Sequence, residues 1–192
     1  TASGSDVLIK TTGYVSQNNG ALTTQGGDVT LWSNATDANG ITNYVYSGTV
    51  TTNDGDLTIG GGSDLATGYA TGNVYGVAMV SSRTVSTGAG SITVRGRLAV
   101  GQASGSSAVA VNSAISTTTG AISITGYVPS TRVQTTYIDY GVKIASTTIT
   151  TDSGAVSISA NSVDSAYQWR TALSVDASTI SSNSGDITLD GA

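Results

Sequence analysis

Four amino acids are missing from this 192-residue chain, which contains no cysteine, histidine, glutamate or phenylalanine. Without cysteine, the chain has neither disulfides nor thiolate ligands for a metal. Without histidine, a nucleophile activated by an imidazole is excluded. We therefore expect no catalytic residues, no metal site and no cofactor.

Charged residues are also scarce, at 10% of the chain with a net charge of −5. The seven lysines and arginines are scattered, so the basic surface that nucleic acids require is absent. No apolar run approaches the roughly 18 residues of a membrane-spanning helix. No signal peptide is visible at the start either. The chain begins at Thr1, which we interpret as the result of a removed leader or as the start of a fragment.

The residues that dominate instead are threonine, serine, glycine, alanine and valine, with 25 glycines and a single proline. These residues suit strands and turns better than helices. The same composition is also typical of disordered segments. A regular apolar alternation argues against disorder, because it supplies the core that disordered segments lack.

That alternation belongs to a short repeated signature, a turn residue followed by an apolar residue, serine or threonine, and a second apolar residue. It occurs at residues 27–31, 55–59, 90–94, 120–124, 154–158 and 185–189, with a degenerate copy at 6–9. A period of two places both apolar side chains on one face, as in a half-buried strand. The copies are separated by 22 to 35 residues, a period typical of solenoids.

Each repeat holds two further predicted strands. One directly precedes the signature, at residues 21–24, 49–52, 84–87, 114–117, 148–151 and 179–182. The other lies further upstream, at residues 43–46, 77–80, 108–111, 142–144 and 173–175. Turn residues such as Asn53, Asp54 and Gly55 lie between the strand that directly precedes the signature and the signature strand itself. They suit a left-handed backbone corner.

Three strands per repeat, joined by short corners, predict an all-β fold: a right-handed parallel β-helix (β-solenoid) with variable loops on one side. We expect one domain over residues 1–192, with about six coils of three strands and a length of roughly 30 Å. Antiparallel hairpins are the competing interpretation, but Asn-Gly turn signals occur at only two places. Stacking predicts three internal columns: Val29, Leu57, Ile92, Ile122, Val156 and Ile187; Leu31, Ile59, Val94, Ile124, Ile158 and Leu189; and Leu22, Val50, Val85, Ile115, Ile149 and Ile180.

Segments of variable length connect each signature to the upstream strand of the next repeat. We expect these segments to be loops on one flank of the solenoid. They carry most of the large aromatic residues and arginines, Arg95, Arg97 and Tyr167 included. The candidate ligand-binding residues among them are Trp32, Tyr69, Tyr75, Tyr127, Arg132, Tyr137, Trp169 and Arg170. Aromatic faces suit sugars or a protein receptor, and arginine suits carboxylates. The alternative, which we favour, is that these side chains cover the apolar columns and brace their own loops.

The aspartates offer weaker sites. Asp54 and Asp56, with Asp64 nearby, have oxygen atoms that could bind calcium, although a plain corner explains them better. The least implausible polar clusters for catalysis are Asp139 with Lys143 and Asp164 with Arg170.

The run at residues 50–59 and its echo at 180–189 resemble repeats of filamentous-haemagglutinin-like bacterial adhesins and other large surface proteins. The resemblance implies a right-handed β-helix, secreted and displayed on the bacterial surface as a long shaft. We therefore expect a non-enzymatic structural segment of an extracellular adhesin or surface fibre. The alternatives are a carbohydrate- or receptor-binding module that uses the aromatic loops, and a self-assembling filament subunit. The expected partners are neighbouring coils or other copies end to end, with a host glycan or receptor as a further option.

Overall fold

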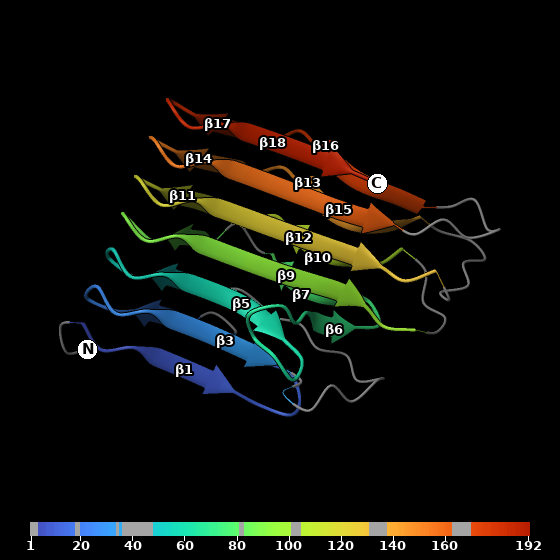
Figure 1. The fold of residues 1–192 in the computed structure, drawn as a ribbon, viewed down its shortest axis with the longest axis horizontal. Coiled ribbons are helices and arrows are strands. Elements are labelled where there is room, and N and C mark those ends of the chain that lie inside the picture. The colour runs from blue at the N-terminus through green and yellow to red at the C-terminus, as the bar shows by residue number, and fades with distance from the viewer. Residues whose placement is uncertain are drawn as a thin grey trace.

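A computed structural model of the chain describes residues 4–17, 20–33, 35, 48–80, 83–100, 105–130, 138–162 and 170–192. Within these ranges the regular structure consists of strands, with no helix. The strands pair in parallel and stack into a solenoid, with N- and C-termini on its first and last layers (Figure 1). Parallel pairing excludes the hairpin alternative.

The largest sheet contains the signature strands. Its order is β1 (Val7–Lys10), β3 (Val29–Ser33), β5 (Leu57–Gly61), β9 (Ile92–Leu98), β12 (Ile122–Val128), β15 (Val156–Ser162) and β18 (Ile187–Gly191), with β6 (Ala70–Gly72) also paired to β9. Successive neighbours in this sheet are 22 to 35 residues apart along the chain, so each winding returns to the same sheet.

Two further sheets complete the windings. One contains β2 (Ala21–Thr23), β4 (Thr49–Thr51), β8 (Thr84–Ser86), β11 (Ala114–Thr117), β14 (Thr148–Thr151) and β17 (Thr179–Ser182). The other contains β7 (Tyr75–Met79), β10 (Ser107–Val111), β13 (Asp139–Ala145) and β16 (Arg170–Asp176). All three strands of a winding are thus described for about four turns. The third strand predicted at residues 43–46 lies outside the described residues.

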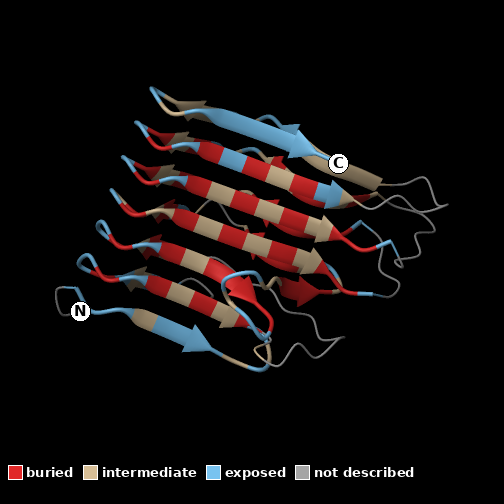
Figure 2. Ribbon diagram, viewed as in Figure 1, coloured by how far each residue is buried: buried red, intermediate tan, exposed pale blue. Residues whose placement is uncertain are grey.

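The predicted registers are confirmed residue by residue, but the columns are not internal in the last layer, where Ile187 and Leu189 are 43% and 49% exposed. Ile92 pairs with Leu57 on one side and Ile122 on the other, and Ile122 pairs in turn with Val156. The second signature column and the column of the preceding strand keep their predicted registers throughout. Buried and partly exposed residues alternate along the middle strands (Figure 2). Aliphatic side chains therefore form one continuous core cluster along the axis.

Corner threonines connect the second strand of a winding to the signature strand. The buried Thr117 hydroxyl donates to the carbonyl of Gly120 at 2.6 Å, and Thr24 makes the equivalent bond to Gly27 at 2.5 Å. Thr52 and Thr87 repeat it with Gly55 and Gly90. In these four corners a hydroxyl three residues before the glycine satisfies a buried carbonyl, whereas the hydroxyls of Thr151 and Ser182 accept the amides of Gly154 and Gly185.

Replacing Thr117 with valine is expected to lower the free energy of unfolding by about 1.5 kcal/mol, because it leaves the buried Gly120 carbonyl without this donor. Urea unfolding measures the loss. Thr148→Val is the matched control, since Thr148 is exposed on β14. Equal losses in both variants would contradict a role for the hydroxyl.

The expectation that the aromatic and arginine residues lie in loops is wrong for several of them. Trp32 belongs to β3, Tyr75 to β7, Tyr127 to β12 and Arg170 to β16. Three signature strands, β9, β12 and β15, are seven residues long and continue past the five-residue motif, because the alternation of inward and outward residues continues. In β9 the inward residue is Gly96, where a Cβ atom would lie 2.0 Å from the Ala108 carbonyl oxygen. Such a glycine gives no apolar signal in the sequence.

Candidate functional site

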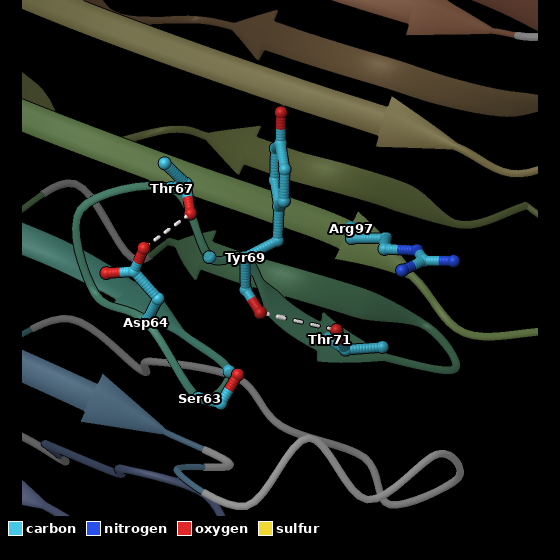
Figure 3. Close-up of a pocket in the computed structure, with 8 residues that line it drawn as sticks. Ser63, Asp64, Thr67, Tyr69, Thr71 and Arg97 are labelled. Carbon is cyan, nitrogen blue, oxygen red and sulfur yellow. Dashed lines mark hydrogen bonds between the residues drawn. The ribbon is translucent and has the colours of Figure 1, made fainter.

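A polar pocket of about 220 Å³ lies where the turn after β5 meets β6 and β9. It is lined by Gly62, Ser63, Asp64, Thr67, Gly68, Tyr69, Thr71 and Arg97. Figure 3 shows the Asp64 and Thr67 side chains facing each other across the loop, whereas Arg97 extends away on the other side of Tyr69. The lining thus combines three aliphatic hydroxyl groups, one carboxylate, one guanidinium and one tyrosine.

The loop at residues 62–69 is organised by Asp64. Its Oδ1 atom accepts the Ala66 amide at 2.9 Å, and its Oδ2 atom accepts the Thr67 hydroxyl at 2.9 Å. The Gly68 amide donates to the Asp64 carbonyl at 2.6 Å. The pKa of Asp64 lies below its ordinary value, mainly because of the hydrogen bond from the Ala66 amide and then that from the Thr67 hydroxyl. The charge of Arg95 acts in the same direction, and desolvation opposes these effects but is smaller than either hydrogen bond. Asp64 is therefore a carboxylate at neutral pH.

Removing the Thr67 hydroxyl is expected to raise the pKa of Asp64 toward its ordinary value. The stabilising contribution of this exposed carboxylate is present above its unfolded-state pKa and is lost as the pH falls through its lower folded-state pKa. An NMR titration of the Asp64 carboxyl carbon in Thr67→Ala checks the shift, with Ser63→Ala as control. An unchanged titration midpoint in Thr67→Ala would contradict this account.

Two large side chains brace the loop from neighbouring strands. The Trp32 indole nitrogen donates to the Gly62 carbonyl at 2.6 Å, and an Arg95 guanidinium nitrogen donates to the Leu65 carbonyl at 2.9 Å. The Lys10 ammonium lies 3.8 Å from the centroid of the Trp32 ring. The indole N–H of Trp32 is thus bonded to the loop, and the face of its ring is covered by the Lys10 ammonium. Both contacts agree with a role in bracing the loop rather than in binding a ligand.

Beside the loop, aromatic and cationic side chains of successive windings meet. The rings of Tyr69 and Tyr127 lie 6.2 Å apart between centroids, tilted by 42°. The Arg97 guanidinium lies 5.4 Å from the centroid of the Tyr127 ring. Arg97 and Tyr127 are register partners in β9 and β12, and Thr71 of β6 is the partner of Arg97 on its other side. The Nε atom of Arg97 is buried and has no hydrogen-bond partner.

The structure brings together only some of the predicted ligand-binding residues. Tyr69 lines the pocket, Tyr127 packs beside it, and Trp32 braces its loop. Tyr75 and Arg170 lie in the sheet of β7 and β16 and do not line the pocket. The predicted residues Arg132, Tyr137 and Trp169 lie outside the described residues.

Other lining residues were not predicted as part of one site. The sequence indicates Asp64 only as a candidate calcium ligand and gives no signal for Thr67 or Thr71. Arg97 was grouped with the loop arginines, although it lies in β9. The available signal was the spacing of Arg97 and Tyr127 from their signatures, since both stand five residues after the first apolar residue.

The candidate calcium ligands contact backbone amides instead. An Asp54 carboxylate oxygen accepts the Ala89 amide at 2.8 Å, and an Asp56 oxygen accepts the Ser91 amide at 2.7 Å. Asp6 and Asp28 make the same bond to the next winding. Across the described ranges, no group of three acidic or other metal-binding side chains is close enough to hold a metal ion. Asp54 and Asp56 thus behave as corner residues.

Asp64 is the only carboxyl group among the lining residues of the pocket, so this lining does not contain the pair of carboxylates that most glycosidases use. The described residues also include no helix that could cross a membrane. Together, the fold and the site define a parallel β-solenoid that carries a polar pocket on its flank. No protein-family model matches the chain, and the searches of curated proteins and of solved structures found no match either.

Proposed function

We propose that the chain is a non-enzymatic structural segment of an extracellular bacterial adhesin or surface fibre. In this role it is a stiff shaft that displays the side chains and loops of its flanks. The observation that carries the proposal is the unbroken parallel register of seven signature strands along one axis. A rod with one repeating cross-section suits the projection of a binding surface away from a cell.

The stiffness has a direct source in the hydrogen bonds along the axis. In each signature except the last, the amide of the first apolar residue donates to a backbone carbonyl in the next winding. The acceptor is the residue directly before the equivalent apolar residue, so the Ile92 amide, for example, donates to the Ala121 carbonyl. For Val29, Leu57, Ile92, Ile122 and Val156 each of these bonds measures 2.8 Å. Bending the rod would stretch these bonds on one side and would open the aliphatic columns to water.

The finer architecture also belongs to the proposal. We expect six full coils of three strands, with residues 43–46 supplying a third strand to an early coil. We expect a right-handed winding, since crossovers between parallel strands are right-handed in nearly all folds. A crystal structure tests both points, and a left-handed winding would contradict the second.

Hydrogen exchange tests the shaft directly. Amides of the first apolar residue in the middle signature strands, such as those of Ile92, Ile122 and Val156, are expected to exchange most slowly, because they are buried and bonded along the axis. Amides of the loop at residues 62–69 are expected to exchange much faster. Protection spread evenly over the chain would argue against a stack of axial bonds.

The cellular role needs a separate test. Antibodies raised against the chain are expected to label intact cells of its source as strongly as permeabilised cells. Labelling that requires permeabilisation would overturn the surface location, while the shaft architecture would stand. Release of reducing ends from polysaccharides by the purified chain would overturn the non-enzymatic role.

A further inference from the structure

We infer that the pocket formed by residues 62–69, Thr71 and Arg97 binds an uncharged pyranose of a glycan, whose adjoining sugars lie over the Tyr69–Tyr127 pair. This inference adds a recognition function to the proposed shaft. It does not depend on the shaft's cellular role, because it rests on the lining of one pocket.

The first argument is the match between the pocket lining and sugar hydroxyl groups. Ser63, Thr67 and Thr71 supply hydroxyls that both donate and accept. Each Asp64 oxygen already accepts one bond and keeps a second acceptor site for a sugar hydroxyl. Hydrogen bonds to a carboxylate are about twice as strong as those between neutral groups. A cavity of about 220 Å³ has room for one pyranose ring.

The second argument is the adjoining aromatic pair. Tyrosine side chains offer an apolar face with a polar tip, a combination that suits the apolar face and the hydroxyl rim of a sugar ring. Tyr69 belongs both to the pocket lining and to the pair with Tyr127. Figure 3 shows its ring standing away from Asp64, so a chain of sugars can pass from the pocket onto the ring.

The charge of the site favours an uncharged sugar. One carboxylate, Asp64, and one guanidinium, Arg97, line the pocket with opposite charges, while the Arg95 guanidinium donates to the Leu65 carbonyl and is not among the lining residues. The ionised Asp64 opposes an acidic sugar, and the net charge of −5 acts in the same direction. A single carboxylate is too few ligands for a divalent cation.

The pocket is also held in shape before any ligand arrives. Trp32 and Arg95 fix the loop carbonyls of Gly62 and Leu65, and Asp64 fixes the turn between them. A loop ordered in advance loses less entropy on binding, so a few hydrogen bonds suffice for measurable affinity.

The test is the binding of the purified chain to immobilised oligosaccharides with terminal glucose, galactose or mannose, compared with sialylated and uronic-acid-terminated ones. The expected result is binding of at least one neutral glycan and a preference for it over the acidic ones. Tyr69→Ala and Asp64→Asn are each expected to weaken it by about tenfold or more. Tyr14→Ala, which removes an exposed tyrosine from outside the pocket, is expected to stay within about twofold of wild type.

Three outcomes would overturn the inference: no binding to any neutral glycan, a preference for the acidic glycans, or full binding by both pocket variants. Circular dichroism verifies that the variants are folded. If either variant fails to fold, the neutral oligosaccharide that binds the wild-type chain is titrated into that chain, and the amide chemical shifts are followed by NMR. Amide shifts centred on residues 62–71 and 97 support the site, and shifts confined to other residues overturn it.

Discussion

Replacing Gly120 with alanine is expected to lower the free energy of unfolding by about 3 kcal/mol, the upper end of the usual cost of overpacking. A Cβ atom at this position would lie 1.9 Å from the carbonyl oxygen of Gly90 and 2.3 Å from its carbonyl carbon. Both atoms belong to the backbone of the preceding winding, so no side chain can move aside. The windings themselves would have to separate.

The clash at Gly120 recurs along the whole axis, because each signature glycine lies against the one before it. A Cβ atom on Gly90 would meet the Gly55 oxygen at 2.0 Å, and one on Gly154 would meet the Gly120 oxygen at 2.0 Å. The glycines therefore form a seam through which successive windings approach each other closely. This seam explains why the turn residue of the signature is so often glycine.

Chemical denaturation of Gly120→Ala measures the loss of stability. Gly13→Ala is the matched control, because the nearest atom to its Cβ would be the Thr11 hydroxyl oxygen at 3.8 Å, an ordinary contact. The control is expected to change the stability by less than about 0.5 kcal/mol. A Gly120→Ala variant as stable as Gly13→Ala would show that the windings can separate at no cost.

Much of the fold could be predicted, because its strongest signal is local. Apolar residues alternate with serine and threonine in each signature, and that alternation alone places Leu57, Ile92 and Ile122 in one column. The left-handed corner was also predictable, and Asn53 and Asp54 adopt φ angles of 51° and 85°. The role of the neighbouring glycine was not, since its requirement comes from the winding below and not from its own backbone angles.

The candidate site was less predictable, because its contacts cross between windings. Tyr69 and Tyr127 are 58 residues apart in the sequence (127 − 69), and their rings meet because Tyr69 precedes β6, which pairs with β9, and β9 pairs in turn with β12. The inward residue before Arg97 is Gly96, which interrupts the apolar alternation between Val94 and Leu98 in the strand that positions Arg97. Asp64 has the ordinary sequence context of a turn, and only the folded arrangement places it in the lining of a pocket.

Truncating Ile122 to alanine is expected to lower the free energy of unfolding by about 4 kcal/mol, near the upper end for large-to-small core changes. Its side chain is fully buried, and its strand neighbours in the column are Ile92 and Val156. The cavity would interrupt the column in the middle of the solenoid. Because each winding contacts mainly its neighbours, the loss of hydrogen-exchange protection should be greatest in β9, β12 and β15.

The same substitution at Ile187 separates the effect of the column from that of the residue type. Ile187 occupies the equivalent position in β18 but is 43% exposed, so Ile187→Ala is expected to cost less than about 2 kcal/mol. Ser123→Ala, on the outward face beside Ile122, is expected to change stability by less than about 0.5 kcal/mol. Urea unfolding of the three variants ranks these costs. Equal losses for Ile122→Ala and Ile187→Ala would mean that stability does not depend on having an apolar neighbour in the column on both sides. That result would contradict the proposal that continuous aliphatic columns stabilise the shaft.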